Sequence, residues 1–429
     1  MLTTEQTLAM IKTEKAQALL VNMYGQEHLA QQTSRYESLI HAYQKHFGDN
    51  EILLFSAPGR CEIGGNHTDH NYGKVLAGSI NLDTIAAAAK VEEPVITFIS
   101  EGYADTYEID LTDLSPQPGD DGTRSLVRGI AAGCKEFGYE IGGFTAYVSS
   151  SVFSASGLSS SASFEMLICT ILSSFYNHGS LDAVAMSKIG QYAEHQYWNK
   201  PSGLLDQMAC AYGGLIAIDF NDPIHPEIRP LECDFQSNGY SLVIVNTGGN
   251  HADLTEDYAS VPHEMHAVAK LFGVQVCRQI SKEQLYASMS AVREQAGDRA
   301  VLRALHFFEE NERVDGQVKA LEEGQFDEFL SLVNESGNSS WKWLQNCYRS
   351  QDVKEQDIPI ALAITESYIK MIGQGACRVH GGGFAGVILA ILPNDKVSNY
   401  KEQVEATLGT SVLVIQVREH GAIEFNRFV

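Results

Sequence analysis

The chain has 429 residues, of which 44% are hydrophobic and 20% are charged, values that are ordinary for a globular protein of two or three domains. Lysine and arginine number 30 and aspartate and glutamate 54, so the formal net charge is −24. This charge repels nucleic acid and the anionic face of a membrane, so neither is an expected partner, whereas a local group of amides and cations still allows a small anionic substrate.

The cysteines and the N-terminal segment both indicate a cytoplasmic protein. None of the eight cysteines forms a C-x-x-C pair, so we expect free thiols in a reducing compartment. Charged residues such as Glu5 and Lys12 interrupt the N-terminal segment, which therefore lacks the apolar core of a signal peptide. The longest strongly apolar run, residues 384–392, is far shorter than the roughly 20 residues that span a bilayer.

The first half of the chain alternates helical and strand patterns. Thr3 and Gln6 make a capping box, which predicts a helical extension over residues 1–30, and a second helix is expected from about Ser34 to His46. The next segment reads as a buried strand that ends in a turn at Pro58-Gly59. Alternation and helical spacing then predict further strands over 75–91, 95–100 and 144–152, and helices over 125–137 and 164–176.

The second half begins with a buried strand at residues 241–249, and helical patterns follow to about Ile372. A glycine-rich segment then precedes an apolar strand, and a closing strand is expected over 410–417. Mixed strands and helices with hairpin candidates predict an α+β protein in two lobes. We place the two domains at residues 31–235 and 236–429.

Residues 154–163, SASGLSSSAS, lie between a predicted strand and a predicted helix. Small residues let the backbone approach a ligand closely, and the helix N-terminus offers unpaired N–H groups that suit a triphosphate. The G-K-[ST] ending of a Walker A loop is absent. The alternative is a turn that only tightens the packing of strand and helix.

A second polar loop, residues 57–73, carries Arg60 and crowds His67, Asp69 and His70 together. A metal site is one interpretation, but the flanking glycines are unusual for metal loops. Hydrogen bonding to a polyol fits better, because Asp and His recognise hydroxyl pairs well.

Two further segments carry chemistry. Asp206 follows a Pro-Ser-Gly turn that can aim it into a cleft, and Glu194 lies upstream, so the pair could supply the base and the metal carboxylate of phosphoryl transfer. A surface acid or helix cap is the alternative for Asp206. The three glycines at 381–383 permit close approach to a ligand, or simply form a hairpin turn into a core strand.

Taken together and in order, these segments resemble the galactokinase branch of the sugar, homoserine and mevalonate (GHMP) kinase superfamily, from about Tyr36 onward. PGRCEIGGNHTDHNYG resembles that branch's signature, G-R-x-N-L-I-G-E-H-T-D-Y-N. GLSSSAS is similar to its phosphate loop, GLLDQM to its catalytic G-I-M-D-Q, and GGGFAG to its closing glycine motif. The resemblance implies a two-lobed GHMP kinase fold with mixed β-sheets and helices and the active site in the cleft between the lobes.

The resemblance also implies roles for single residues. Asp206 would be the base near the anomeric hydroxyl of the sugar, and Arg60 would stabilise the transferring phosphoryl group. Ser160, or a neighbouring serine, and Glu194 would hold Mg²⁺. The phosphates of ATP would be cradled by Ser156, Gly157, Leu158, Ser159, Ser160 and Ser161. The sugar pocket would be lined by Asn66, His67, Asp69, Gly203 and Tyr258.

The chain departs from the family pattern at the sugar end. The signature's glutamate is Asn66 here and its tyrosine is His70, and His380 replaces the usual threonine or serine. The segment after Tyr258 lacks the usual arginine pair, and Pro262 is expected to disturb a helix start there. Because Asn66 removes a charge, we expect a pocket more tolerant at C6 of the sugar.

The expected function is an ATP-dependent sugar 1-kinase that acts on galactose, with ATP and Mg²⁺ as cofactors. One alternative is a 1-kinase for another galactose-like sugar, such as galacturonic acid, N-acetylgalactosamine or arabinose. A second alternative is a non-catalytic sensor that binds sugar and ATP. The sequence leaves the choice between monomer and dimer open.

Overall fold

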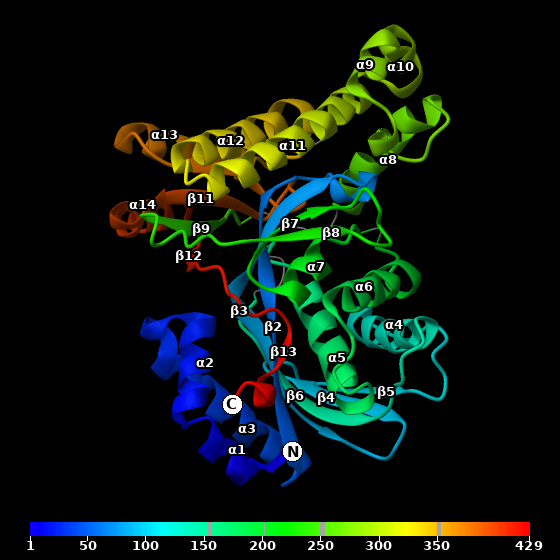
Figure 1. Cartoon of the computed structure of the whole chain (residues 1–429), viewed down its shortest axis with the longest axis vertical. Helices are drawn as coiled ribbons and strands as arrows, with labels where there is room; N and C mark the ends of the chain where they lie inside the picture. The colour runs from blue at the N-terminus through cyan, green and yellow to red at the C-terminus, as the bar shows by residue number, and fades with distance from the viewer. Residues whose placement is uncertain (153–156, 201, 249–253, 350–352) are drawn as a thin grey trace.

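The structure is a computed structural model that describes residues 1–152, 157–200, 202–248, 254–349 and 353–429. Its described residues form two β-sheets, of nine and four strands, with helices packed against them (Figure 1). The two sheets and their helices make up the two lobes, so the predicted α+β architecture is confirmed. No helix in these ranges is long and apolar enough to cross a membrane.

The larger sheet runs in the order β1-β2-β3-β6-β4-β5, with β13 added beside β2, β7 beside β3 and β8 beside β7. Within the described residues its pairs are antiparallel, except the parallel pair of β4 and β6. Its strands are β1 (Leu2–Thr3), β2 (Glu51–Gly64), β3 (Lys74–Lys90), β4 (Val95–Ser100), β5 (Thr106–Asp110), β6 (Phe144–Ser150), β7 (Leu215–Asp219), β8 (Glu227–Leu231) and β13 (Ile423–Glu424).

Strand β2 continues through Pro58 and Gly59, so the predicted turn at this point is wrong. The pairing of β2 with β3 shifts register between Pro58 and Arg60 and again between Glu62 and Gly64. A bulge accommodates a proline in a strand because the missing N–H falls where the ladder is already interrupted. The strand therefore bends instead of ending, and Arg60 and Glu62, two residues apart, lie on the same face of it.

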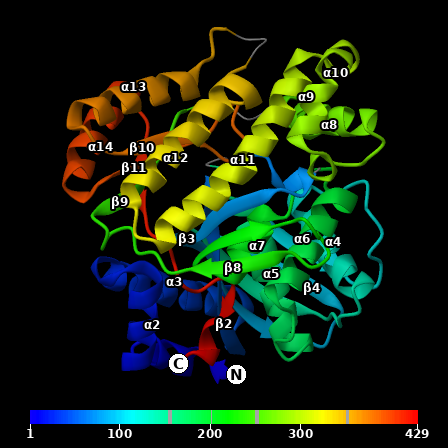
Figure 2. The ribbon, with the colours of Figure 1, turned by 45° about the horizontal axis from the view of Figure 1, so that its top comes forward.

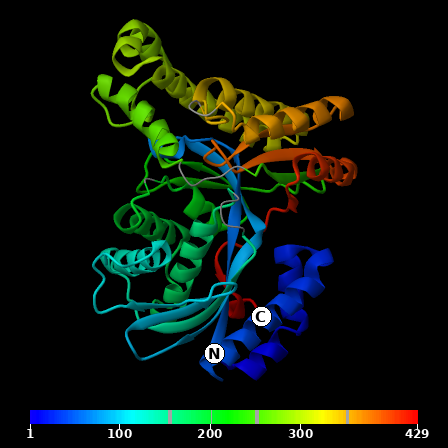
Figure 3. The same cartoon turned by 180° about the vertical axis from the view of Figure 1, so that it is seen from behind.

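Two groups of helices cover opposite faces of this sheet (Figure 1 and Figure 3). Along β3, Ile85 and Ala87 pack with the N-terminal helices, whereas Ala86 and Ala88 pack with the helices of the other face. The predicted capping box of Thr3 and Gln6 is present. The N-terminal group is α1 (Thr4–Met10), α2 (Glu14–Tyr24), η1 (Gln26–His28) and α3 (Leu29–Phe47); the other is α4 (Gly122–Glu136), α5 (Ser160–Tyr176), α6 (Ala183–Tyr197) and α7 (Leu205–Tyr212).

The second sheet is antiparallel in the order β10-β11-β9-β12, and side chains of β9 alternate between its two faces. Leu242 and Ile244 share a core with α11 and α12, whereas Val243 and Val245 share one with α13 and α14. Figure 2 shows α11 and α12 side by side across this lobe. The strands are β9 (Tyr240–Asn246), β10 (Ala376–His380), β11 (Val387–Pro393) and β12 (Val412–Ile415).

The remaining elements of the second lobe are helical, as predicted to Ile372. They are α8 (Thr255–Leu271), η3 (Cys277–Gln279), α9 (Lys282–Ala287), α10 (Met289–Ala296), α11 (Asp298–Glu322), α12 (Phe326–Ser339), the π-helical turn η4 (Ser340–Leu344), α13 (Asp357–Ile372), η5 (Asn394–Lys396) and α14 (Val397–Leu408). Short 3₁₀ turns also follow β2, as η2 (Asp69–Asn71), and β13, as η6 (Phe425–Arg427).

Helix α8 runs through Pro262, so the expectation that this proline disturbs a helix start is wrong. Proline inside a helix removes one hydrogen bond. In α8, Val261, Met265 and Val268 are buried in one apolar cluster, and this tertiary packing outweighs the local cost.

The end of the chain returns to the first lobe, where β13 pairs with β2 and both termini lie at the same end of the molecule (Figure 1). The domain division that we place after residue 235 falls between β8 and β9. Whether the two parts fold as separate units stays a prediction. Strand β13, at residues 423–424, lies in the second part of the sequence but pairs with β2 of the first.

Candidate active site

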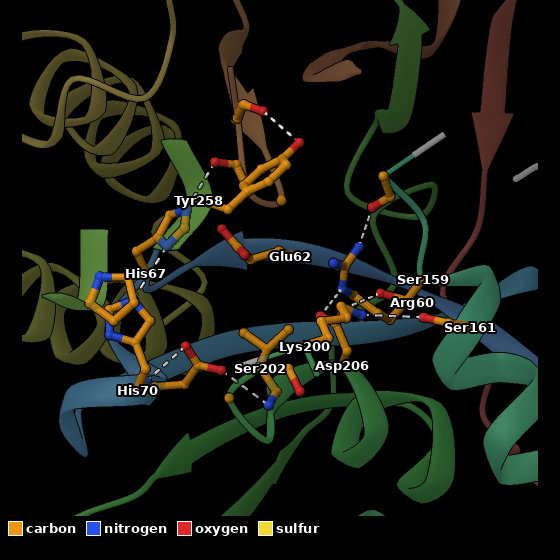
Figure 4. Close-up of a pocket in the computed structure, with 18 of the residues that line it drawn as sticks. Arg60, Glu62, His67, His70, Ser159, Ser161, Lys200, Ser202, Asp206 and Tyr258 are labelled. Carbon is orange, nitrogen blue, oxygen red and sulfur yellow. Dashed lines mark hydrogen bonds and ion pairs between the residues drawn. The ribbon is translucent and has the colours of Figure 1, made fainter. Parts of the chain in front are cut away.

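A cavity of about 580 Å³ lies between residues of the two lobes (Figure 4). The first lobe contributes the end of β2, the start of α5 and the segment before α7, and the second contributes α8 and residues 380–385. Ten predicted site residues line it: Arg60, His67, Asp69, Gly157, Ser159, Ser160, Ser161, Gly203, Asp206 and Tyr258. Three do not, namely Asn66, Leu158 and Glu194, and Ser156 lies outside the described residues.

Asp206, in the first turn of α7, is bonded on both carboxylate oxygens. Nε of Arg60 donates to Oδ1 at 2.8 Å, and Oγ of Ser159 donates to Oδ2 at 2.5 Å. Arg60 also donates through Nη1 to the carbonyl of Gly157 and through its backbone N–H to Leu158 O at 3.1 Å. The predicted base, the predicted arginine and the phosphate loop are therefore joined in one hydrogen-bonded group.

Electrostatics keep Asp206 ionised. Burial alone would raise the pKa of Asp206, but the cations Arg60 and Lys200 outweigh it and hold the pKa below its usual value. The same ion pair acts on Arg60, where burial would lower the pKa but Asp206 and Glu62 raise it. At neutral pH the site thus contains a carboxylate beside a guanidinium.

Ser159 precedes α5 in the left-handed region, with φ 60° and ψ 55°. A non-glycine residue there costs about 1–3 kcal/mol, and such strain persists where surrounding contacts hold it. The contact with Asp206 holds Ser159, whose own side chain makes no capping hydrogen bond to the first turn of α5. The amides of that turn are therefore available to an anion, beside Ser160 and Ser161 at the cavity wall.

The predicted magnesium ligand Glu194 is not open to an ion. It is fully buried, accepts a hydrogen bond from Gln207 Nε2 at 3.0 Å and another from Ser202 Oγ, and forms an ion pair with Lys200. Oxygen donors of this kind suit Mg²⁺. With the ammonium group of Lys200 in contact with the carboxylate, however, Ser160 and Glu194 do not fit a metal ion between them. Among the described residues no cluster of three or more His, Cys, Asp or Glu could hold one.

At the opposite end of the cavity, Asp69 packs directly against Gly203. A Cβ added to Gly203 would lie 1.7 Å from Oδ2 of Asp69, so any larger residue there would displace the carboxylate. Oδ1 of Asp69 accepts the N–H of His70 at 3.0 Å and Oδ2 that of Leu205 at 3.3 Å. Burial, reinforced by Asp206, raises the pKa of Asp69 to about 6.

Hydrogen bonds fix the tautomers of the two histidines beside Asp69. Gly382 O accepts from Nε2 of His67 at 2.9 Å, so Nδ1 of His67 is the acceptor that faces Nε2 of His70 at 3.3 Å. Asn71 Nδ2 in turn donates to Nδ1 of His70 at 2.9 Å. Burial lowers the pKa of His67 to about 4, so both bonds involve a neutral ring.

Tyr258 of α8 closes the second-lobe side of this end. Its hydroxyl donates to Gly383 O at 3.1 Å, and its ring lies against Gly382, where an added Cβ would be 2.5 Å from the ring. The ring also meets Phe384 edge to face, with centroids 5.7 Å apart. Gly382 therefore allows the tyrosine ring to approach the backbone closely.

Asn66 is placed behind the cavity wall and not on it. Its Nδ2 donates to Glu62 Oε1 at 2.8 Å and to Gly381 O at 2.7 Å, and its Oδ1 accepts from Asn346 at 2.9 Å and Ser340 at 3.1 Å. These four bonds saturate a side chain that is fully buried. In this structure Asn66 can act on a sugar only through its neighbours.

Comparison with known proteins identifies the family. The model of the galactokinase galactose-binding signature matches residues 41–90, and that of the GHMP kinase N-terminal domain matches residues 125–214. The galactokinase of Glaesserella parasuis serovar 5 is 30% identical over 369 residues, 84% of this chain and 91% of that protein. The chain belongs to the galactokinase family. The galactokinase of Lactococcus lactis subsp. lactis is also 30% identical, over 86% of this chain and 90% of its own.

Solved structures agree. The crystal structure of Lactococcus lactis galactokinase complexed with galactose has a TM-score of 0.78 and 27% identity, and the match covers 91% of this chain and all of that one. A mevalonate kinase structure with a TM-score of 0.59 is 16% identical over 86% of this chain and shows the shared fold alone. The predicted GHMP kinase fold is therefore confirmed.

Glu62 is a site residue that the sequence analysis missed. It lines the cavity, and its Oε1 accepts hydrogen bonds from Asn66 and from Nη2 of Arg378, at 2.8 Å each. The galactokinase signature has asparagine where this chain has Glu62, and glutamate where it has Asn66. This chain therefore has a carboxylate four residues before the position at which the signature has one. Comparison of position 62 with the signature could have found it.

His380, which departs from the family pattern, also lines the cavity. The backbone N–H of Glu62 donates to its Nε2 at 2.9 Å, and burial, which lowers its pKa, keeps the ring neutral. The proton then sits on Nδ1, which is buried without a partner among the described residues and lies 3.6 Å from the Cβ position of Gly157. Within the part of the chain that the structure describes, this donor has no partner, and it faces Gly157 of the phosphate loop. The exchange of threonine or serine for His380 signals this position in the sequence.

Proposed function

We propose that this protein is an ATP-dependent sugar 1-kinase that transfers the γ-phosphate of ATP to the anomeric hydroxyl of galactose. The observation that carries the proposal is the bonded group of Arg60, Asp206 and Ser159 beside the N-terminus of α5. ATP is the phosphate donor of the GHMP kinases. Galactose is the sugar in the solved Lactococcus lactis complex, and we extend it to this chain.

In the proposed transfer, O1 of the sugar forms a bond to the γ-phosphorus while the bond to the β–γ bridging oxygen breaks, and ADP leaves with that electron pair. Asp206 accepts the hydroxyl proton. Because Arg60 and Lys200 lower its pKa, Asp206 is ionised at neutral pH but is a weak base. The proton therefore moves late, as charge develops on O1, which suits the loose transition state of phosphoryl transfer.

The phosphate end rests on the start of α5, where Ser159 makes no capping hydrogen bond and the amides and positive dipole attract the triphosphate. Arg60 adds a fixed charge close to the transferring group. We propose Mg²⁺ as the counterion that arrives with ATP and neutralises charge on its phosphate oxygens. We assign no step to a magnesium ion on Glu194, because Lys200 occupies that carboxylate.

Fewer galactose-like sugars remain as alternatives to galactose. Galacturonic acid would bring a carboxylate into a cavity that already holds Glu62, and two close carboxylates repel each other. N-acetylgalactosamine and arabinose carry no such charge and remain alternatives. The sensor alternative is disfavoured by the assembled contact of Arg60 with Asp206.

The test is ATP consumption with Mg²⁺ over galactose, N-acetylgalactosamine, galacturonic acid, arabinose, fucose and glucose. Galactose is expected to give the highest kcat/KM and galacturonic acid the lowest among the galactose-like sugars. Asp206→Asn should reduce kcat by about 10²–10⁴ and leave ATP affinity unchanged. Asp315→Asn, a change at an exposed ion pair with Lys74, is the matched control. Sugars that stabilise the protein against heat but never consume ATP would establish the sensor instead.

A further inference from the structure

Lys200 lies in the short segment between α6 and α7, six residues after Glu194, and its side chain reaches the cavity that contains Asp206 (Figure 4). Its Nζ forms an ion pair with Glu194 and lies 3.5 Å from Oγ of Ser161. The ammonium group therefore stands between the serines at the start of α5 and the buried carboxylate.

The surroundings of Lys200 are acidic on several sides. Glu194, Glu165 and Asp206 all act on it, and together they outweigh burial, which alone would lower its pKa, so the pKa is raised and the group stays charged. Glu165 shares the Nε2 donor of Gln207 with Glu194, at 3.0 Å each. Burial and the neighbouring Glu194 raise the pKa of Glu165 well above its usual value.

Two ion pairs set the charge balance of this region. Lys200 pairs with Glu194, and Arg60 pairs with Asp206. A second cation placed between Ser161 and Glu194 would meet the ammonium at contact distance, where like charges repel strongly. The ammonium group of Lys200 thus occupies the position that the sequence predicts for a metal ion.

We propose that Lys200 is a tethered cation of the phosphate site, which binds the phosphate oxygens of ATP from the position between Ser161 and Glu194. This inference rests on the proposed function. An ammonium group has three donors, and the lysine side chain is flexible. Lys200 can therefore keep its ion pair with Glu194 and replace the 3.5 Å contact with Ser161 by a hydrogen bond to a phosphate oxygen. Glu194 is then the positioning residue of Lys200 and not a metal ligand.

The experiment measures nucleotide affinity without turnover. Binding of a non-hydrolysable ATP analogue is followed by calorimetry, in EDTA and in excess Mg²⁺, for the wild type and for Lys200→Met and Lys200→Arg. The wild type should bind the analogue in EDTA within about tenfold of its affinity in Mg²⁺. Lys200→Met should lose tenfold or more in EDTA and clearly less in Mg²⁺, because the metal can then approach Glu194. Lys200→Arg keeps the charge and should stay close to the wild type.

Lys188→Met is the matched control, since it removes the same charge from α6, and Nζ of Lys188 donates to the carbonyl of Ile224, outside the cavity. Equal affinities of the wild type and Lys200→Met in EDTA would overturn the inference. An equal loss in EDTA and in Mg²⁺ would overturn it as well, because a lysine that only shapes the loop acts on both. If the wild type binds no nucleotide under either condition, it is the proposed function that fails.

Discussion

Glu62 and Asn66 show how single residues define the sugar end of the site. Glu62 lies at the second register shift of β2, between Glu62 and Gly64, and Asn66 follows two residues after the strand ends. Bulges re-aim side chains next to active sites. Here Glu62 faces the cavity beside Arg60, while Asn66 turns inward to bond it.

This contact predicts strong coupling between the two positions. Asn66→Glu alone places a second carboxylate against Glu62, and Glu62→Asn alone leaves Arg378 without its ionised partner. Each single change should lower kcat/KM for the best sugar by one to two decades, a cost of roughly 1–3 kcal/mol. The double exchange restores one carboxylate and one amide and should recover at least part of that loss.

The measurement is a double-mutant cycle on kcat/KM, with a coupling of about 0.5–3 kcal/mol expected. Asn338→Glu adds the same charge at an exposed position of α12 and serves as the control. Additive losses at positions 62 and 66 would show that the two side chains act independently.

At the scale of single residues, the sequence predicted those that lie in short family motifs. Arg60, Asp206 and the serines stand in short matching segments, and the structure brings them together. Lys200 was missed because its role depends on how the segment after α6 folds back onto Glu194, a contact that no spacing rule reports.

Among the elements, the loop after β2 is held by helices of the other lobe. Glu310 of α11 accepts the N–H of Gly65 at 3.1 Å and the hydroxyl of Ser336 at 2.5 Å. His306 of the same helix donates through Nε2 to Asn66 O at 2.9 Å. A first-lobe loop thus depends on second-lobe side chains for its shape.

The buried histidines of this contact make stability depend on pH. Burial lowers the pKa of His67 and of His306 to about 4, whereas both titrate near 6.5 when unfolded. Between pH 6.5 and pH 4, the two histidines bind protons in the unfolded chain but stay neutral in the native state. Their contribution is complete above pH 6.5 and declines toward pH 4, by about 1.4 kcal/mol per pH unit for each histidine.

Urea unfolding at pH 7.5, 6 and 5 measures this slope. His306→Asn should flatten it by about one proton, although it also lowers the overall free energy of unfolding. His225→Gln, a change at an exposed histidine on the surface, is the control. The assignment fails if His306→Asn and the wild type keep the same slope.

Most of the predicted elements followed from periodicity, and two expectations that the structure overturns have physical reasons. Pro58 and Pro262 were read as breakers, but a register shift accommodates the first and apolar packing of α8 holds the second. Both depend on tertiary contacts, which local propensity does not contain.

Across the whole molecule, Asp83 ties distant segments to one buried carboxylate. It accepts hydrogen bonds from Arg35 of α3 at 2.6 Å, from Arg418 at 2.9 Å, from Tyr24 at 2.5 Å and from Ser56. Burial alone would raise the pKa of Asp83, but Arg35 and Arg418 outweigh it and lower the pKa. The N-terminal helices, the first sheet and the end of the chain therefore share one charge centre.

Asp83→Asn should destabilise the protein by about 3–5 kcal/mol, because it leaves two buried guanidinium groups without their counterion. Denaturant unfolding measures the loss, and Asp315→Asn, at a pair on the surface, should cost at most about 1 kcal/mol. Similar stabilities of the two variants would contradict a central role for Asp83.

Because the end of the chain pairs with β2, the first lobe can be completed only late in biosynthesis. Arg418 follows Asp83 by 335 residues, and β13 is later still. At about 5–20 residues per second, a ribosome needs roughly 20–70 s to supply that interval. Throughout it, the nascent first lobe has an incomplete sheet and a carboxylate that lacks one of its arginines. This lobe reaches its finished form only after nearly all of the chain has been translated.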